Sequence, residues 1–423
     1  MSRLLRGRLV SFDAGDGPPA YVEDGGLLIR DGRIAAVGDF AAVAPPGMAA
    51  EDWRPRLILP GFVDPHIHFP QTHAQAAWGG QLLDWLNGQI FPAETRFADP
   101  AHAAATAARF LDETLRHGTT TVCAFGSVHA ASVEALFAEA LRRNLRLFAG
   151  KVLMDRNAPE ALRDDPETGA AETAALIARW RGRGRLGYAI APRFAITSTP
   201  EQLAAAGALA AAHPGCLMQT HLSENRAEIA ATLALYPQAR DYTDVYARFG
   251  LLGPRSLMGH CIHLSGRERA AMAEAGAVAV FCPTSNLFLG SGLFDLAATR
   301  AAGVRVAVAT DVGAGTAWGL PATLGAAHGI GQLLGAPLHP FDAFRLATAG
   351  NAAALGVGDV IGRLAPGYEA DLVVLDPRAT PAMALRAAIV ESLADELFVI
   401  QTLGDDRAVA AVYVAGEPAR PAG

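Results

Sequence analysis

The chain has 423 residues, with 35 basic and 42 acidic side chains and a formal net charge of −7. This acidic balance, without a basic tail, argues against binding of a nucleic-acid polymer through its phosphates. Apolar residues make up 51% of the chain and charged residues 18%, which excludes disorder over most of its length.

The sequence carries no sign of export or membrane insertion. Residues 1–12 alternate apolar residues with arginine, so we expect no signal peptide. No run reaches the roughly 18 apolar residues that a membrane span needs. The cysteines are scattered without a CxxC pair, as in reduced intracellular proteins. We therefore expect a soluble, cytoplasmic protein; its four cysteines are Cys123, Cys216, Cys261 and Cys282.

The two ends of the chain have the same character. Residues 1–56 and 362–417 contain short alternating apolar runs broken by Gly and Pro, with turn signals such as Asp31-Gly32. Neither end is long enough to bury a good core alone. The sequence predicts one small β-sandwich domain made by both ends, residues 1–58 plus 362–423.

Between these ends, short apolar runs alternate with segments of helical period. This alternation predicts βαβ units and a parallel sheet. Eight units over about 250 residues indicate an α/β fold of the (β/α)8 TIM barrel type, over residues 59–361. An open doubly wound sheet would need a Gly-rich fingerprint after its first strand, and none is present. The predicted strands are 57–68, 119–126, 146–154, 186–194, 216–224, 256–264, 277–286 and 305–313, and the helices between them include 100–117, 132–143, 200–212 and 266–275.

Metal-binding side chains stand at the ends of predicted strands, where a barrel places its active site. The first strand ends His66-Ile67-His68, and the period of two puts both histidines on one face. His221 ends the fifth strand and Asp311 the eighth. Each alone has a structural reading, such as a helix cap for Asp311, but their coincidence at four strand-end positions favours a metal site. Three imidazoles and a carboxylate suit one Zn²⁺ per chain, with a position left for water.

The neighbouring residues suggest a hydrolytic mechanism. Zinc lowers the pKa of bound water from about 15.7 towards 7. Glu224 is placed to shuttle a proton to the leaving group, although it could instead begin the next helix. Asp311 would take the proton of the water as the base, and His260 would hold that water in line. His73 is undecided, and the other histidines are expected to be structural: His102, His117, His129, His213, His263, His328 and His339.

Several motifs resemble the amidohydrolase superfamily and, within it, the guanine deaminase family. They are PGFVDPHIHFPQTHAQAAWGGQLLDWLNGQIFPAE (60–94), GKVLMDRNAP (150–159), APRFAITST (191–199), QTHLSEN (219–225), GHCIHLS (259–265), FCPTSNLFLGSGLF (281–294) and ATDVGAGT (309–316). The resemblance spans the whole chain. The HxH pair and EADLVVLDP (369–377) are typical of the superfamily, whereas QLLDWL, IFPAE and PRF are typical of the narrower family. Pro65 departs from that family, where a small polar residue is usual before the first ligand.

The resemblance implies hydrolysis of guanine to xanthine and ammonia by a zinc-dependent homodimer. It implies that Gln71 and Arg193 hydrogen-bond guanine and that Phe194 supplies a backbone or stacking contact. These residue types suit the base, because Arg offers fixed donors and a Gln amide both donates and accepts. An ion pair for Arg193 and a solvated position for Gln71 are the structural alternatives. The resemblance implies zinc ligands His66, His68, His221 and Asp311, a proton shuttle Glu224, and substrate contacts from His68, His221, Glu224 and Asp311 as well.

Other readings are weaker. A binuclear amidohydrolase commonly needs a carbamylated lysine at the fourth strand, but the only lysine, Lys151, lies in the third. A deaminase acting on cytosine, a purine nucleoside or a triazine is disfavoured by Arg193 with Gln71. A non-enzymatic barrel is disfavoured by the complete ligand set, and the separate HxE/PCxxC deaminase fold is excluded because no PCxxC exists. Four residues could form a pocket wall or core: Trp78, Leu82, Leu83 and Trp85.

Overall fold

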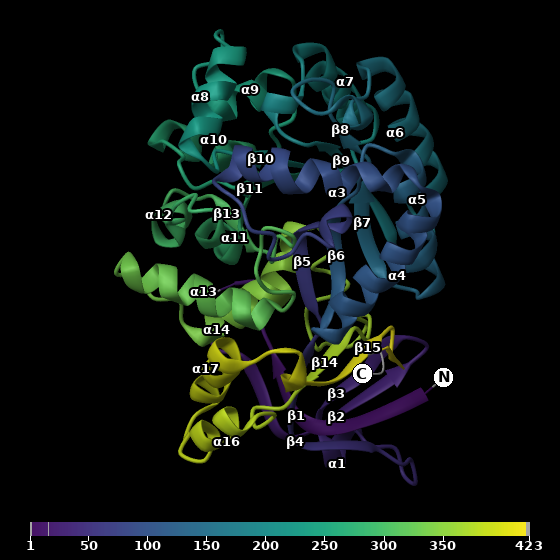
Figure 1. The fold of residues 1–423 in the computed structure, drawn as a ribbon. Coiled ribbons are helices and arrows are strands. Elements are labelled where there is room, and N and C mark those ends of the chain that lie inside the picture. Colours follow the sequence, from purple (N-terminus) through teal and green to yellow (C-terminus); the bar gives the residue numbers. More distant parts are fainter. Residues whose placement is uncertain (1, 16, 420–423) are drawn as a thin grey trace. The chain divides into compact units, whose positions relative to one another are not determined.

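The computed structural model describes residues 2–15 and 17–419. The chain forms two compact units, one that contains most of the barrel and one that contains both end segments of the sequence (Figure 1). The predicted combination of a parallel barrel with a β domain from both ends is confirmed, but the described residues of that domain form one mixed sheet in place of the two sheets of the predicted sandwich. The barrel unit comprises Pro65–Phe110 and Val122–Ala317, and the terminal unit comprises Met1–Asp64, Leu111–Thr121 and Trp318–Gly423.

In the terminal unit, segments from opposite ends of the sequence form one mixed sheet of seven strands in the order β16-β15-β14-β4-β1-β2-β3. β14 pairs antiparallel with β4, which joins the two ends of the chain, and β1 pairs parallel with β4. Leu5, Leu27, Ile58 and Leu372 belong to its buried core. The strands are β1 Ser2–Ser11, β2 Ala20–Arg30, β3 Arg33–Asp39, β4 Glu51–Pro60, β14 Leu372–Leu375, β15 Val409–Val414 and β16 Glu417–Pro418.

The barrel sheet runs in the order β13-β12-β11-β10-β9-β7-β6-β5, with the short β8 paired to β9. Adjacent strands from β7 to β13 are parallel. The ring is closed where the His68 amide donates to the Val312 carbonyl at 2.7 Å and the Asp311 amide donates to the His66 carbonyl at 3.0 Å. The strands are β5 Phe62–His68, β6 Thr119–Phe125, β7 Arg146–Gly150, β8 Val152–Leu153, β9 Leu186–Pro192, β10 Leu217–Leu222, β11 Ser256–His260, β12 Val278–Phe281 and β13 Arg305–Val308.

The first predicted strand, residues 57–68, was wrong in one respect, because it consists of two strands in different sheets. Residues up to Pro60 pair with β14 in the terminal sheet. Gly61 then interrupts the pairing, and Phe62 begins β5 of the barrel. Every residue from Leu57 to His68 is buried, so the apolar pattern does not reveal the change of sheet.

The helices of the barrel unit follow its strands, as predicted. Helices α7 and α10 have the predicted bounds because each starts at a side-chain cap, Thr199 for α7 and Ser265 with Glu268 for α10. The loop after β5 contains a π-helical turn, Leu86–Ile90, between two short helices. The helices are α2 Leu82–Trp85, α3 Phe91–Thr95, α4 Pro100–Arg116, α5 Ala130–Arg142, α6 Pro166–Trp180, α7 Pro200–Ala212, α8 Arg226–Leu235, α9 Tyr242–Arg248, α10 Gly266–Ala275, α11 Pro283–Phe288 and α12 Leu296–Ala301.

The terminal unit carries its own helices, α1 Phe40–Val43, α13 Leu320–Leu333, α14 Pro340–Arg345, α15 Asn351–Ala354, α16 Pro381–Ala387 and α17 Leu393–Leu403. In the described part of the chain, no helix has the length and apolar character required to cross a bilayer. The predicted domain boundaries, 1–58 with 362–423 and 59–361, stay a prediction, because strands β5 and β6 contribute residues to both compact units.

Candidate active site

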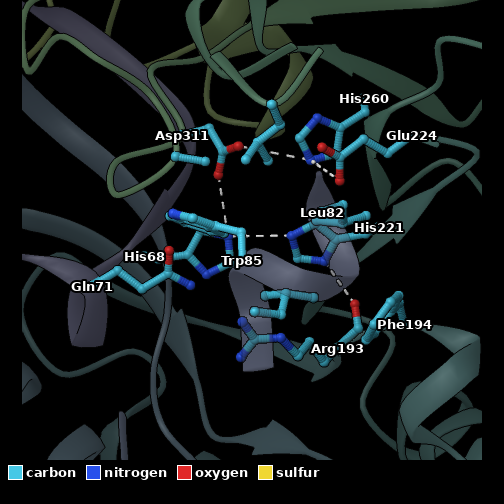
Figure 2. A pocket seen from close by; sticks show the side chains of 13 residues that line it. His68, Gln71, Leu82, Trp85, Arg193, Phe194, His221, Glu224, His260 and Asp311 are labelled. Atoms are coloured by element: carbon cyan, nitrogen blue, oxygen red, sulfur yellow. Dashed lines mark hydrogen bonds and ion pairs between the residues drawn. The ribbon is translucent and has the colours of Figure 1, made fainter. Parts of the chain in front are cut away.

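A pocket opens at the carboxyl ends of the barrel strands. Asp311, His260 and Glu224 lie on one side of the cavity and Arg193 lies on the opposite side, with His68 and His221 between them (Figure 2). Apart from His66, every residue predicted for the site lines this pocket. The lining residues are His68, Gln71, Leu82, Trp85, Leu86, Arg193, Phe194, His221, Glu224, His260, Leu289, Asp311 and Ala314.

The four predicted metal ligands come together from three parts of the barrel. His66 and His68 end β5, and their donor atoms lie within 4.8 Å of each other and of a donor atom of His221 on β10. Asp311 Oδ1 is 3.4 Å from His66 Nε2 and 3.2 Å from His68 Nε2. This buried set of three imidazoles and one carboxylate has the chemistry of a zinc site.

A second group of donors overlaps the first. His66 and Asp311 also lie with His260 and Cys282 within 4.8 Å. Cys282 follows β12 directly and was not considered as a ligand in the sequence, although it stands at a strand end like the others. His260 is held on its far side, where Nδ1 lies 2.9 Å from Asn286 Oδ1.

The protonation of the ligands suits metal binding. Burial lowers the pKa of His68 to about 4 and that of His221 well below its usual value, so both imidazoles are neutral at pH 7. Burial favours the protonated form of Asp311, but hydrogen bonds to His66 and His68 outweigh it and hold its pKa well below the usual range. Asp311 is therefore a carboxylate at neutral pH.

His221 is oriented by the backbone. Its Nδ1 lies 2.7 Å from the Arg193 carbonyl oxygen, which can only accept a hydrogen bond. The proton is therefore on Nδ1. The unprotonated Nε2, which can bind a metal through its lone pair, lies 3.2 Å from His68 Nε2. A ligand imidazole fixed in this way by an outer acceptor is typical of metal sites.

Glu224 lies between the metal-binding group and a loop after α11. Ser291 Oγ donates to its Oε1 at 3.0 Å, and its Oε2 is 3.4 Å from His260 Nε2. Burial and the charge of Asp311 raise the pKa of Glu224 to about 8, whereas the Ser291 hydrogen bond lowers it. A carboxyl group that titrates near neutral pH is suited to general acid–base work.

Glu224 does not cap the next helix, which was the alternative role predicted for it. The cap of α8 is Asn225, whose side chain accepts from Ala227, and Glu228 completes the capping box. The Glu224 side chain therefore remains directed at the pocket. Sequence reasoning missed its partner Ser291, although this serine stands within the quoted motif 281–294.

At the other end of the pocket, Arg193 and Gln71 share a buried carboxylate. Arg193 Nη1 donates to both oxygens of Glu94, at 2.9 and 2.7 Å, and Gln71 Nε2 donates to Glu94 Oε1 at 3.0 Å. The ion-pair alternative for Arg193 is thus real, yet Arg193 also lines the pocket. Glu94 was missed as a site residue; the available signal was that a buried arginine needs a buried acid.

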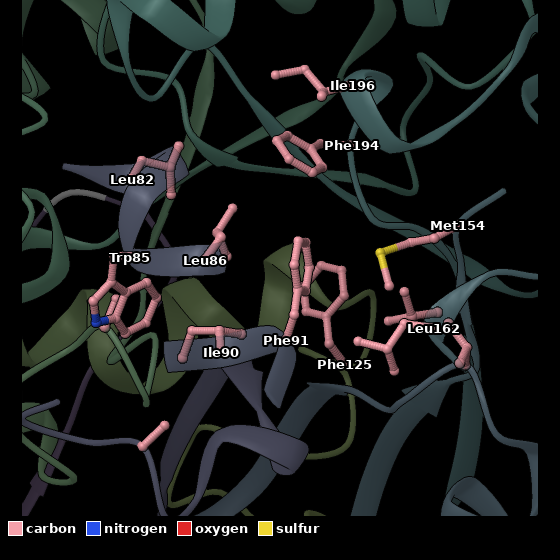
Figure 3. Close-up of a cluster of buried hydrophobic side chains, with 14 of the residues drawn as sticks. Leu82, Trp85, Leu86, Ile90, Phe91, Phe125, Met154, Leu162, Phe194 and Ile196 are labelled. Carbon is pink, nitrogen blue, oxygen red and sulfur yellow. The ribbon is translucent and has the colours of Figure 1, made fainter. Parts of the chain in front are cut away.

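The pocket wall comes largely from the loop after β5. Leu82, Trp85 and Leu86 line the pocket and also belong to a buried apolar cluster with Phe91 and Phe194 (Figure 3). Both predicted readings, wall and core, therefore hold for Leu82 and Trp85. Leu83 only packs against this cluster, and Trp78 is 88% exposed.

His73, for which the sequence predicted no definite role, and Lys151 lie outside the pocket. His73 faces His102, with ring centroids 6.0 Å apart. Lys151 is completely buried between β7 and β8, where its Nζ forms ion pairs with Asp164 and with Glu172, the latter at 3.3 Å. Both of these lysine partners are carboxylates, and neither lines the pocket.

The backbone at the site is unusual. His260 and Asp311 have φ angles of 68° and 53°, in the left-handed region that costs non-glycine residues energy. Gly259 precedes one of them, and a Cβ atom at this glycine would lie only 2.5 Å from His66 Cε1. Strand β11 therefore approaches a predicted ligand too closely for any side chain at position 259.

Comparisons with known proteins agree with this geometry. The sequence profile of the amidohydrolase family matches residues 57–419. Guanine deaminase from Escherichia coli (strain K12) is 47% identical over 399 residues, covering 94% of this chain and 91% of the relative. The solved E. coli guanine deaminase superposes with a TM-score of 0.96 at 44% identity, covering 99% of both chains. A Clostridium acetobutylicum guanine deaminase with bound guanine in its active site superposes with a TM-score of 0.91 at 29% identity, covering 99% of this chain and 100% of that one.

Proposed function

The chain belongs to the guanine deaminases of the amidohydrolase family, and we propose that it hydrolyses guanine to xanthine and ammonia with a water activated at a zinc site. The observation that carries this proposal is the pocket itself. It places a metal-donor set, a carboxyl group of raised pKa and an Arg/Gln pair around one cavity. These are the three parts that hydrolytic deamination of a purine base requires.

The donor set fits zinc, which His66, His68, His221 and Asp311 would hold. When bound there, zinc would lower the pKa of a coordinated water and so supply the nucleophile at neutral pH. Three imidazoles and one carboxylate make a set of four ligands, which suits one ion per chain. The lowered pKa values of His68, His221 and Asp311 favour neutral imidazoles at these two histidines and an ionised carboxylate, which are the protonation states that metal binding needs.

The side chains divide the chemical work. Gln71 and Arg193 would hydrogen-bond the purine at the end of the pocket away from the metal ligands, with Phe194 beside them. Asp311 would accept the proton of the attacking water as the base, and His260 would orient that water. His68, His221, Glu224 and Asp311 would border the substrate as well as serving the reaction.

Proton transfer is assigned to Glu224. In the reaction a C–O bond forms at C2 of guanine, the C2–N bond to the amino group breaks, and ammonia leaves. Glu224 would give its proton to the ring as water adds, take up the proton of the added hydroxyl group and pass it to the departing amine. The proton that Asp311 accepts from the water would then restore Glu224. Its raised pKa supports this role, because the group must be both a good acid and a good base near pH 7.

Ultraviolet assays with guanine, adenine, cytosine and a triazine, run side by side, test the proposed substrate. We expect xanthine and ammonia from guanine and no comparable turnover of the other three. Turnover of cytosine or a triazine in preference to guanine would contradict the proposal. Glu224→Gln serves as the control for contaminating deaminases, because it should be inactive in the same preparation.

Location and assembly are proposed on separate grounds. The four cysteines are buried and none of them forms a disulfide, which supports a reducing compartment and hence the cytoplasm. The resemblance to guanine deaminases supports a homodimer. The partners proposed are guanine and water, with no nucleic-acid polymer and no membrane.

A further inference from the structure

We infer that Glu94 is a positioning residue that sets which hydrogen-bond donors face the purine. The inference rests on the proposed function and concerns the end of the pocket opposite the metal ligands. Glu94 is 1% exposed and is hydrogen-bonded to both Arg193 and Gln71. It does not line the pocket itself, so it acts through these two neighbours.

The carboxylate decides the orientation of the Gln71 amide. An ionised carboxylate can only accept hydrogen bonds, so the amide must turn its NH₂ group towards Glu94. The Gly313 amide, 3.4 Å from Gln71 Oε1, lies on the carbonyl side and agrees with this orientation. Without Glu94 nothing as strong would distinguish the two ends of the amide. One N–H of Gln71 therefore remains available for a ligand, in a fixed place.

The carboxylate also fixes Arg193. One guanidinium nitrogen, Nη1, serves both oxygens of Glu94, at 2.9 and 2.7 Å. The N–H donors on Nη2 and Nε are not used by Glu94. Arg193 Cζ also lies 5.6 Å from the centre of the Phe91 ring. Both contacts come from α3, so one short helix holds the guanidinium from two sides.

These orientations favour a ligand edge made of acceptors. A purine with an oxygen at C6 presents that oxygen and the ring nitrogen N7 as neighbouring acceptors. A purine with an amino group at C6 would instead place N–H against N–H. A buried site whose donors are left unpaired by a 6-amino purine binds that base much more weakly than a 6-oxo purine. This difference in affinity is larger than the difference that a missing methyl group causes in an apolar pocket. Glu94 thus contributes to the selection of a 6-oxo purine without touching it.

The buried ion pair also sets the charge at this end of the pocket. Arg193 is 3% exposed, and a guanidinium so deeply buried needs an acid beside it. Glu94 provides that compensation, so the pair has no net charge and suits an uncharged base. The helix that carries Glu94 is anchored by Ile90 and Phe91 in the apolar cluster (Figure 3), which keeps the carboxylate in place.

The test is Glu94→Gln, which keeps the shape but presents an NH₂ group to Arg193 and Gln71. We expect KM for guanine to rise at least about tenfold, since a hydrogen bond to a charged group is lost at the recognition end. We expect kcat to change less than KM and the zinc content to be unchanged. Glu396→Gln is the control, because Glu396 makes an Arg–Glu pair of the same kind with Arg8 in the terminal unit, although a less buried one, and should leave both constants as they are.

A double-mutant cycle shows whether Glu94 acts through Arg193. In an Arg193→Ala background, Glu94→Gln should add much less to KM than it does alone. Equal effects in both backgrounds, or an unchanged KM in Glu94→Gln, would overturn the positioning role while guanine turnover by the wild type stands. A wild type inactive on guanine would overturn the proposed function, and this inference with it. If Glu94→Gln does not fold, Glu94→Asp should still raise KM, and an unchanged KM there would overturn the inference.

Discussion

The His221 ring donates a hydrogen bond to the backbone carbonyl of Arg193 across 2.7 Å, so Arg193 contacts both functional ends of the pocket. Its main chain orients a predicted metal ligand, and its side chain reaches Glu94 and the purine end. The two roles use different atoms of one residue. Changes to the side chain should therefore separate substrate binding from metal binding.

Arg193→Ala should raise KM for guanine by about tenfold or more, because hydrogen bonds from a charged donor contribute roughly 1.5–3 kcal/mol. The zinc content should stay at the wild-type level, because the carbonyl that orients His221 is retained. Steady-state kinetics and metal analysis on the same preparation check both expectations. An unchanged KM would show that guanine lies elsewhere in the pocket, and loss of metal would show that the side chain also supports His221.

Glu224→Gln should keep its metal and lose turnover, because an amide cannot exchange the proton. It should also change stability with pH. The pKa of Glu224 is raised from 4.5 to about 8, so between these values the unfolded chain gives up a proton that the folded chain keeps. The contribution of Glu224 to the free energy of unfolding therefore falls as pH rises through that window.

In metal-free protein, Glu224→Gln should consequently melt at a higher temperature than wild type at about pH 9, with the difference vanishing near pH 4. Thermal melts over this range measure the difference directly. Retained turnover would remove Glu224 from the mechanism. A pH-independent difference in melting temperature would show that packing, rather than ionisation, separates the two proteins.

Ser291→Ala should move the basic limb of kcat/KM to higher pH. The Ser291 hydroxyl donates to Glu224 Oε1 and thereby lowers the pKa of that carboxyl group. Without the hydroxyl, Glu224 should keep its proton to a higher pH, which extends the range in which it can act as an acid. Rate profiles between about pH 6 and 10 would reveal the shift. A limb that stays in place would mean that another group controls it.

Gly259→Ala should weaken metal binding, because the added Cβ would lie 2.5 Å from His66 Cε1 and 3.1 Å from His66 Nδ1. Loss of the groups that orient a metal ligand typically lowers the affinity for the metal by about 10–100-fold, and displacement of His66 should have an effect of this size. Competition with a chelator measures this. Gly253→Ala is the control, since nothing lies within 4 Å of a Cβ at that position. Equal metal affinities in the two variants would contradict the close approach as the reason for a glycine.

Metal analysis should give about one zinc per chain, and a chelator should abolish turnover. The second donor group, which includes His260 and Cys282, shares His66 and Asp311 with the first. A single ion that uses both shared ligands leaves too few donors for another. Two tightly bound ions per chain would contradict the mononuclear site and point to these additional donors.

The barrel could be predicted because its strands are buried on both faces and therefore appear as continuous apolar runs. The same property hid the junction at Gly61, where one apolar run passes from the terminal sheet into the barrel. Helix bounds were predicted best where a capping side chain marks the start, as at Thr199 and Ser265.

The site could be predicted where chemistry coincides with a strand end. His66, His68, His221 and Asp311 stand at such positions, and the structure gathers them. Glu94, Ser291 and Asn286 could not be found in this way, because they lie on helices and loops whose partners are fixed only by the folded chain. Their importance follows from what they contact, and those contacts span up to 99 residues of sequence.

The buried state of Lys151 has a practical consequence for handling the protein. It is the only lysine of the chain, its side chain is inaccessible, and its ammonium is paired with Asp164 and Glu172. Acylating reagents require a free, exposed amine, and this side chain offers neither. Labels, cross-linkers and surface-coupling reagents aimed at lysine will therefore leave the folded barrel unmodified, and acylation of Lys151 would report unfolding instead.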